Sequence, residues 1–251
     1  MIIVLASGHD PTAETFVEQH GDQGVCMMTP ADLSCVGWRH HLGDVENGTA
    51  VAAGRELSLR SITGVLTRLP WIAEYDLPHI VRGDRAYVAT EMSAFLLSWL
   101  SELKCPVLNR PTPQCLSGPF WTHEKWVHTA DRLGIPVTAV QRDIRLFGAA
   151  CPTADGDPGG ATVTIVGHRN VGTVDQDLTQ QARALADAAG VDLLAVRFSR
   201  ATRGAAFLDA KLWPDLVDGE VAHAVLEYFS GSSTGADSDV EGLGDSSLGN
   251  S

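Results

Sequence analysis

Lysine is scarce in this sequence of 251 residues. Only Lys104, Lys125 and Lys211 occur, against fifteen arginines, so few ammonium groups are available to bind phosphate as point charges. Acidic residues outnumber basic ones, and the formal net charge is −13. A strongly acidic protein repels phosphodiester backbones and anionic lipid surfaces. We therefore expect no nucleic-acid partner and no membrane partner.

Signatures of membrane, disulfide-bonded and common nucleotide-binding proteins are missing as well. No apolar run reaches the roughly 18 residues of a membrane-spanning helix, and no basic segment precedes the apolar N-terminus. The five cysteines form no C-x-x-C pair and are odd in number, which favours reduced and mostly buried thiols. Neither G-x-G-x-x-G nor G-x-x-x-x-G-K occurs. We expect a cytoplasmic protein without a Rossmann or P-loop site.

The first half of the chain alternates short apolar segments with amphipathic ones, which is typical of a parallel sheet flanked by helices. Strands are predicted at residues 2–6, 25–29, 45–51, 62–68 and 106–109, and helices at residues 11–20 and 85–103. Asp10 or Thr12 should cap the first helix and Asp84 the second, whose apolar stripe begins at Tyr87. Arg68 ends a strand at the edge where open α/β sheets bind ligands. It can bind a carboxylate or phosphate there, or form a surface salt bridge.

A proline-rich connection joins this half to the rest of the chain. Pro111 and Pro113 end the preceding strand, and a helix then follows until Gly134 and Pro136. The helix is predicted from apolar residues at helical spacing, namely Phe120, Trp121, Val127, Ala130 and Leu133.

This connection carries a family resemblance. The strand running into Asn109-Arg110-Pro111, the helix with Lys125 and the run Leu133-Gly-Ile-Pro-Val137 resemble the hinge of ATP-grasp ligases. Residues 62–137 together resemble the domain that precedes the nucleotide-binding part in glutathione-synthetase-like members. The resemblance implies a pre-ATP-grasp domain, a hinge helix and an ATP-grasp part.

The second half has a different pattern. A hairpin is predicted from strands at residues 161–166 and 171–173, followed by a helix at 175–189 and by strands at 193–198 and 205–212. Thr173 or Asp175 should cap that helix and Gly190 should end it. A last helix is predicted at 214–229. Residues 231–251 are rich in Ser, Gly and Asp and poor in apolar groups, so we expect a disordered acidic tail.

The part that should hold the nucleotide is short. In the ATP-grasp family a mobile lid and two lysines hold the phosphates, and carboxylates bind magnesium. Here no lysine lies between Lys125 and Lys211, and the turn-rich residues 151–160 stand where the lid is expected. The resemblance therefore implies a shortened relative that lacks the central lid region.

The expected metal site is altered too. Phe207-Leu-Asp-Ala-Lys-Leu-Trp-Pro214 stands where the family has its magnesium-binding F-L-E-V-N-P, so Asp209 replaces the glutamate and Lys211 the asparagine. Arg197 falls near the partner acidic position on the preceding strand. Cationic side chains cannot coordinate Mg²⁺. We expect a degenerate metal site of Arg197, Asp209 and Lys211, in which Asp209 pairs with one of the cations, and neither ATP nor magnesium as cofactor.

These predictions combine into one α/β architecture. Residues 1–112 should form a pre-ATP-grasp-like domain with a parallel sheet, 113–137 the hinge helix, 138–230 a reduced ATP-grasp-like α+β part, and 231–251 the tail. Ligand-binding side chains are expected in the cleft between the halves: Arg68, Asn109, Arg110, Lys125, Arg200 and Arg203. On an otherwise acidic protein, their charge would attract an acidic small ligand or an acidic peptide.

Three functions fit the sequence. The one we predict is a non-catalytic ATP-grasp-like protein that binds or scaffolds a protein or peptide partner, such as an intact ligase, in a biosynthetic or peptide-modification pathway. The second is an active carboxylate–amine ligase with atypical phosphate ligands, namely Arg142, Arg145 and Arg169. The third is an enzyme of different chemistry in the same cleft, with polar groups from His9, Arg68, His123 and His128.

Overall fold

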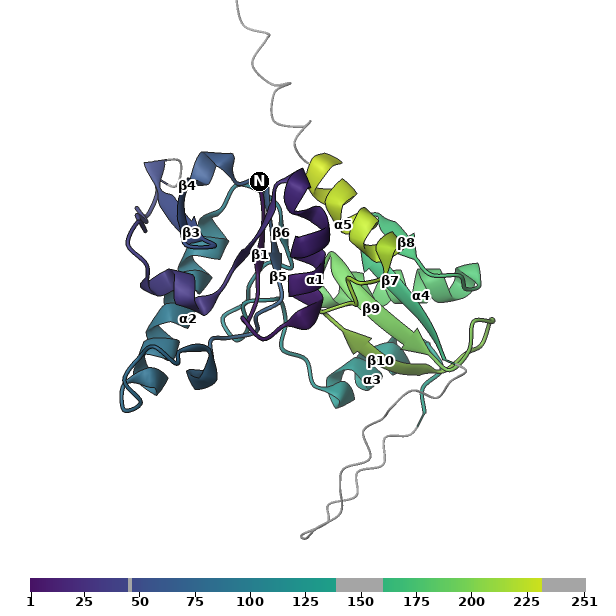
Figure 1. Cartoon of the computed structure of the whole chain (residues 1–251). Coiled ribbons are helices and arrows are strands. Elements are labelled where there is room, and N and C mark those ends of the chain that lie inside the picture. The colour runs from purple at the N-terminus through teal and green to yellow at the C-terminus, as the bar shows by residue number, and fades with distance from the viewer. Residues whose placement is uncertain (45–46, 139–159, 232–251) are drawn as a thin grey trace, which may run out of the picture.

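The computed structural model describes residues 1–44, 47–138 and 160–231 and contains two four-stranded sheets (Figure 1). The N-terminal sheet is parallel, in the order β2-β1-β5-β6. Its strands are β1 (Ile2–Leu5), β2 (Val25–Met28), β5 (Gly64–Thr67) and β6 (Val107–Leu108). The parallel sheet predicted for this half is confirmed.

The first strand and helix follow directly from local sequence. All four residues of β1 are buried, as expected for an inner strand of a sheet covered on both faces. Helix α1 (Pro11–His20) comes next, and the carboxylate of Asp10 accepts hydrogen bonds from the backbone N–H groups of Thr12 and Ala13, both at 3.1 Å. Pro11 occupies the first turn, where a missing N–H costs nothing. Of the two predicted caps, Asp10 is the one that the structure uses.

The strand predicted at 45–51 is replaced in part by a hairpin, and residues 45–46 lie outside the described residues. Its strands are β3 (Thr49–Ala52) and β4 (Arg55–Ser58). The turn residues Ala53 and Gly54 have φ of +50° and +70°. Alanine rarely adopts a positive φ, so Ala53 carries no turn signal in the sequence.

Helix α2 (Arg85–Glu102) covers one face of the parallel sheet through Leu96 and Trp99. One prediction for it is wrong, and the predicted cap is confirmed in position only. Tyr87 is 70% exposed and takes no part in the apolar stripe. Asp84 lies at the N-cap position, but among the described residues its carboxylate accepts no hydrogen bond from the first turn. The 3₁₀ turns of this half are η1 (Gly21–Gln23), η2 (Pro30–Ser34), η4 (Leu59–Ser61) and η5 (Glu74–Asp76).

The C-terminal sheet is antiparallel, in the order β10-β9-β7-β8. Its strands are β7 (Ala161–Val166), β8 (Arg169–Val171), β9 (Leu193–Phe198) and β10 (Phe207–Lys211), and the helices of this half are α3 (His123–Arg132), α4 (Gln176–Ala189) and α5 (Gly219–Gly231). The predicted hairpin is present, but its second strand is Arg169–Val171 and not 171–173. Helix α4 is confirmed: of its two predicted caps Asp175 is the one used, and Gly190 ends it at a φ of +66°.

Two helices begin later than predicted. Helix α5 starts directly after Asp218 rather than at residue 214, and the Asp218 carboxylate accepts a hydrogen bond from its first turn. Helix α3 starts after its cap, Thr122, so Phe120 and Trp121 precede the helix. Both helices begin directly after a capping residue, whereas the predicted helices also included residues that precede the cap.

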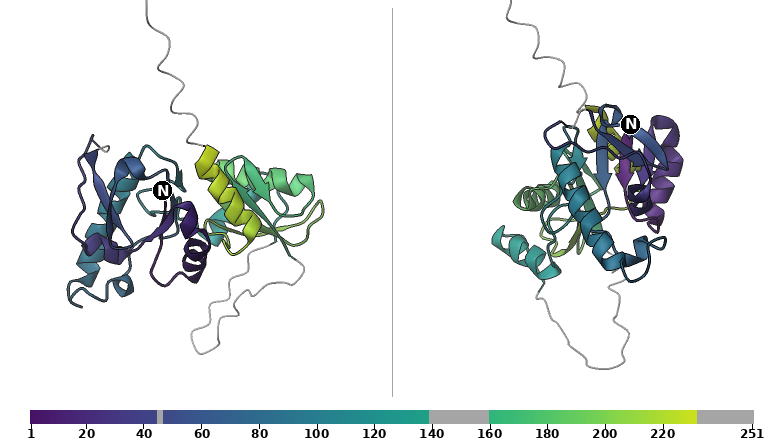
Figure 2. Two further views of the ribbon diagram at one scale, coloured as in Figure 1. Left: turned by 45° about the horizontal axis from the view of Figure 1, so that its top comes forward. Right: turned by 90° about the vertical axis from the view of Figure 1, so that its left-hand side faces the viewer.

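One apolar cluster joins the two sheets. It contains Leu66 and Leu108 of the parallel sheet, Val166 of the antiparallel sheet, and side chains of α1 and α5. Both helices lie between the sheets in Figures 1 and 2. Gly64 allows this packing, since a Cβ there would lie 2.1 Å from the ring of Phe229. The two halves therefore share a core. Separately, no helix in the described part of the chain is long and apolar enough to cross a membrane.

Candidate functional site

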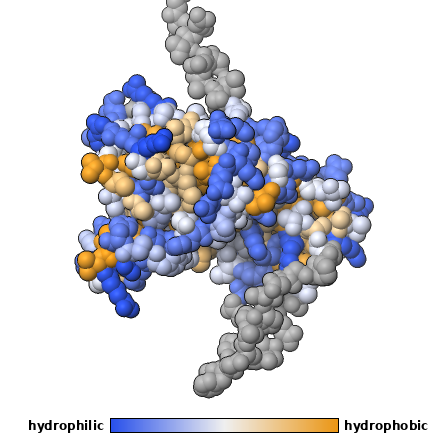
Figure 3. All heavy atoms as spheres, viewed as in Figure 1, coloured by the Kyte–Doolittle hydropathy of each residue, from blue (hydrophilic) through white to orange (hydrophobic). Residues whose placement is uncertain are grey.

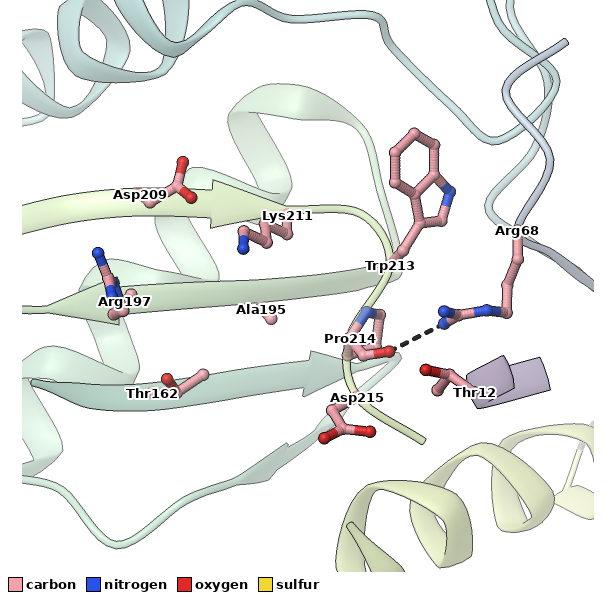
Figure 4. A pocket seen from close by; sticks show the side chains of 10 residues that line it. All are labelled: Thr12, Arg68, Thr162, Ala195, Arg197, Asp209, Lys211, Trp213, Pro214 and Asp215. Atoms are coloured by element: carbon pink, nitrogen blue, oxygen red, sulfur yellow. Dashed lines mark hydrogen bonds between the residues drawn. The ribbon is translucent and has the colours of Figure 1, made fainter. Parts of the chain in front are cut away.

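A cleft of about 580 Å³ lies where the carboxyl end of the parallel sheet meets one face of the antiparallel sheet (Figure 4). Residues from α1, the end of β5, strands β7, β9 and β10, and the segment after β10 line it. They are Thr12, Arg68, Thr162, Ala195, Arg197, Asp209, Lys211, Trp213, Pro214 and Asp215.

Strand register gathers the charged groups of the cleft. Asp209 pairs across the ladder with Arg197, and Lys211 with Ala195. Residues two apart on a strand face the same side, so these positions point into the cleft while Val196 is buried in the core. The three residues of the predicted degenerate metal site are thus brought together.

Arg68 takes part in the cleft wall as a buried bridge. Its side chain is 8% exposed, and its Nε donates to Asp10 Oδ2 at 2.7 Å. Its Nη1 donates to the backbone carbonyl of Pro214 at 2.9 Å, as the dashed line in Figure 4 marks. Of the two roles predicted for Arg68 the structure shows a salt bridge, although a buried one. Its charge is balanced by Asp10, and its function is to tie the segment after β10 to the parallel sheet.

The other two cations of the cleft have no such balance. Neither Arg197 nor Lys211 forms a hydrogen bond or ion pair with any described residue. The predicted pairing of Asp209 with one of them is wrong, because its oxygen Oδ1 instead lies 3.7 Å from Nδ1 of His123. Helix α3 packs against β10 and so brings His123 close to Asp209. The alternation of residues along the strands gives no information about which helix packs on them. Arg197 and Lys211 therefore lie beside Asp209 without a direct bond to any described residue, and Asp215 is a second carboxylate of the cleft lining.

Asn109 lies outside the cleft, although the sequence placed it there. It is 2% exposed, and its Oδ1 accepts hydrogen bonds from the N–H groups of Asp192 and Leu193 at 3.1 and 2.8 Å. Its Nδ2 donates to the carbonyl of Leu193 at 2.9 Å. All of these contacts cross from the parallel sheet to the start of β9, so Asn109 joins the two halves.

The remaining predicted ligand-binding residues also lie elsewhere. Arg110 donates to the carbonyls of Leu103 and Cys105, which follow α2, and lines a separate cavity of about 320 Å³. Lys125 lies over the ring of Trp121, 5.2 Å from its centroid. In the loop after β9, Arg200 donates to the loop's own backbone, and Arg203 pairs with a carboxylate of α4. Only Arg68 of that set reaches the cleft.

Six residues of the cleft lining were not among the predicted site residues: Thr12, Thr162, Ala195, Trp213, Pro214 and Asp215. Thr162 and Trp213 carried a usable signal. Trp213 lies two residues beyond Lys211 and so continues the same side of the chain, and Thr162 lies opposite Arg197 in the ladder. Asp215 lies in an irregular segment, where no periodicity applies.

The described side chains of the cleft bear on the predicted absence of ATP and magnesium, which stays a prediction. In the described part of the chain, no group of three His, Cys, Asp or Glu side chains could hold a metal ion. Lys211 and Arg197 lie beside Asp209 and would repel a divalent cation. Arg142 and Arg145 lie outside the described residues, and Arg169 is ion-paired with Glu227 away from the cleft.

The histidines proposed for other chemistry are not gathered in the cleft either. The ring of His9 lies 6.4 Å from that of Tyr75, and His128 is exposed on α3. Only His123 approaches a cleft residue, through Asp209.

Comparison with known proteins gives a fold. No family model and no curated protein matches the sequence. The macrocyclase MdnC from Microcystis aeruginosa MRC, bound with precursor peptide MdnA, has a TM-score of 0.63 at 12% identity, over 92% of this chain and 99% of that chain. A Chryseobacterium gregarium RiPP-associated ATP-grasp ligase, in complex with ADP and a leader and core peptide, has a TM-score of 0.60 at 11% identity, over 92% and 96%. This chain has the ATP-grasp fold.

The macrocyclase MdnB from the same Microcystis strain agrees, with a TM-score of 0.58 at 14% identity over 91% of this chain and 99% of that chain. The relationship to ATP-grasp ligases predicted from the sequence is thereby confirmed at the level of the fold. The predicted replacement of the lid by residues 151–160 lies almost entirely outside the described residues. The division into residue ranges stays a prediction.

Proposed function

We propose that this ATP-grasp-fold protein is non-catalytic and binds an acidic peptide segment in a peptide-modification pathway. The observation that carries the proposal is the pair of cations Arg197 and Lys211 beside Asp209 in the cleft, neither of which forms a hydrogen bond or ion pair with a described residue. They stand where the resemblance to ATP-grasp ligases places metal ligands.

The electrostatics of the cleft favour a carboxylate-bearing partner. A guanidinium binds a carboxylate through two parallel hydrogen bonds, and an ammonium adds a point charge. Low-dielectric walls strengthen such contacts relative to open water. The remainder of the protein is strongly acidic, so an acidic segment is repelled from most other surfaces, and the donors of Arg197 and Lys211 are open to it in the cleft.

A peptide is the form of partner that the comparisons support. The MdnC structure contains a precursor peptide, and the Chryseobacterium ligase contains a leader and core peptide. We propose that the acidic segment belongs to such a peptide or to an intact ligase of the same pathway. An acidic small molecule would satisfy the same cations, and the experiment below separates the two.

The proposal implies that neither ATP nor magnesium is a cofactor. Asp209 and Asp215 are the carboxylates that line the cleft, and the side chains beside Asp209 are cationic. A second magnesium ligand of the family pattern has become Lys211, which offers only hydrogen-bond donors.

The test measures binding of a fluorescein-labelled octapeptide with four consecutive glutamates, by fluorescence anisotropy. Arg197→Ala and Lys211→Ala should each weaken binding about tenfold, since each removes a charge-assisted contact of about 1.4 kcal/mol. Arg200→Ala is the matched control, because it removes the same net charge from an exposed loop outside the cleft. Equal loss in the control would mean that net charge alone drives binding. Succinate added as competitor tests the small-ligand alternative.

A second candidate function is the active ligase. The observation that favours it is that Asp209, which lies 3.7 Å from His123, keeps a carboxylate in the cleft lining. Calorimetric titration with ATP and Mg²⁺ decides between the two. We expect no heat of binding at millimolar nucleotide. A thermal shift of several degrees with Mg-ATP that Asp209→Ala abolishes would overturn the non-catalytic proposal.

A further inference from the structure

A second concavity, of about 250 Å³, lies between α2 and the segment that follows β6. Its lining is Pro70, Trp71, Thr90, Ser93, Ala94, Leu97, Thr112, Pro113, Gln114, Cys115 and Leu116. None of these lining residues is charged, although charged residues make up 20% of the whole sequence. We call it the apolar groove. Its composition suits an uncharged, bulky side chain and no ion.

Two exposed aromatic residues lie at this place. Trp71, which lines the groove, is 45% exposed and Phe120 is 53% exposed. Their rings make an edge-to-face contact with centroids 5.4 Å apart. The surface that Figure 3 shows is mostly hydrophilic, with apolar residues in small separate groups. Exposed aromatic groups beside an apolar hollow are characteristic of interaction sites.

The apolar groove and the cleft are neighbours that share a wall. Arg68 lines the cleft and Trp71 lines the groove, and three residues of chain span at most about 11 Å. The N–H of Leu116 donates to the carbonyl of Pro70 at 2.8 Å, so the segment after β6 lies against this stretch.

The same segment also approaches the end of β10. A Cβ on Gly118 would lie 3.5 Å from Leu212, which follows Lys211 and packs in the apolar cluster on the other face of the sheet. The groove and the cleft therefore adjoin through the stretch from Arg68 to Trp71.

We propose that the apolar groove receives a bulky apolar side chain, such as phenylalanine or leucine, from the acidic peptide that the cleft binds. This inference rests on the proposed function and names its ligand class. The cleft has two cations without a direct partner among the described residues and the groove lining has no charged residue, so the recognised segment has acidic residues at one end and an apolar residue a few positions away.

The test uses three labelled peptides: one with four glutamates, one with four glutamates and a phenylalanine after a spacer of two to five glycines, and one with the phenylalanine alone. The peptide with both features should bind about five- to tenfold more tightly than the glutamate peptide, as expected for partial burial of one aromatic side chain. Ala94→Phe fills the groove from an exposed helix position without removing a core atom, and should abolish that gain only. Ala86→Phe, exposed on the same helix outside the groove lining, should leave the gain unchanged.

The outcomes separate the two proposals. If both glutamate peptides bind equally and Ala94→Phe has no effect, the groove inference fails while the acidic-peptide function stands. If only the phenylalanine peptides bind, and Ala94→Phe weakens them, the groove binds apolar side chains and the cleft function fails. Absence of binding by all three peptides overturns both.

Discussion

Replacing Asn109 with alanine should destabilise the whole protein, because this side chain holds the two halves together. Its amide makes three hydrogen bonds to the backbone at the start of β9. Those contacts bridge 83 and 84 residues of sequence. The sequence alone placed Asn109 among ligand-binding residues, where its loss would have spared the fold.

The size of the effect follows from which groups lose their partners. Leu193 is 1% exposed, so its N–H loses its Asn109 bond in a place that water does not reach, and its carbonyl loses a bond there as well. Each buried polar group without a partner costs about 1–3 kcal/mol. Two such groups at about 2 kcal/mol each reduce the free energy of unfolding by about 4 kcal/mol. The N–H of Asp192 adds little, since that residue is exposed and water replaces the bond.

The assay is thermal unfolding followed by circular dichroism. About 4 kcal/mol corresponds to a fall in Tm of roughly 8–16 °C for a protein of this size. Asn170→Ala is the matched control, because Asn170 is exposed on β8 and its side chain bonds to no other described residue; it should change Tm by less than about 2 °C. A Tm for Asn109→Ala within 2 °C of the wild type would refute this role. Weaker binding of the glutamate peptide at unchanged Tm would restore Asn109 as a ligand residue.

Three further predictions concern charge and exposure. Arg68→Ala should reduce the free energy of unfolding in urea by roughly 3–5 kcal/mol, because it leaves the carboxylate of Asp10 unpaired; adding Asp10→Asn should recover part of the loss, and no recovery would contradict the buried ion pair. The hydroxyl of Tyr228 donates to Asp192, and burial together with that carboxylate raises the pKa of Tyr228. Tyr228→Phe should therefore reduce the free energy of unfolding by about 1 kcal/mol at pH 7. This difference is complete below the ordinary tyrosine pKa of about 10 and shrinks as the pH rises beyond it. An equal difference at pH 7 and pH 11, measured by urea unfolding, would contradict the linkage. Iodoacetamide should label Cys35 before the three other thiols of the described residues, whose pKa values are raised by burial, and peptide mass spectrometry reports the order.

The burial of the cysteines differs from what the composition led us to expect. The sequence favoured mostly buried cysteines, yet only Cys115 is buried among the four in the described residues, and Cys35 is exposed. Composition gives the average burial of a residue type and leaves its position in the fold open. Cys151 lies outside the described residues.

The sequence by itself determined the regular elements and the chemistry of the altered metal positions. Apolar runs and caps act between neighbours in the chain, so β1, α1 with Asp10, and α4 with Asp175 follow from residues within a few positions of each other. The resemblance to the family's magnesium-binding motif named Arg197 and Lys211 beside Asp209, and the structure has them on one side of adjacent strands.

Only the tertiary structure decided which partner each polar group has. Arg68 bonds to Pro214 across 146 residues, and His123 reaches Asp209 because α3 packs on β10. Asn109 bonds to β9 instead of facing the cleft. A side chain's chemistry is local, but its nearest charge or carbonyl depends on how the sheets and helices pack. For that reason the sequence named Arg197 and Lys211 near Asp209 but misjudged the partner of Asp209, and it put into the cleft four cations that do not line it: Arg110, Lys125, Arg200 and Arg203.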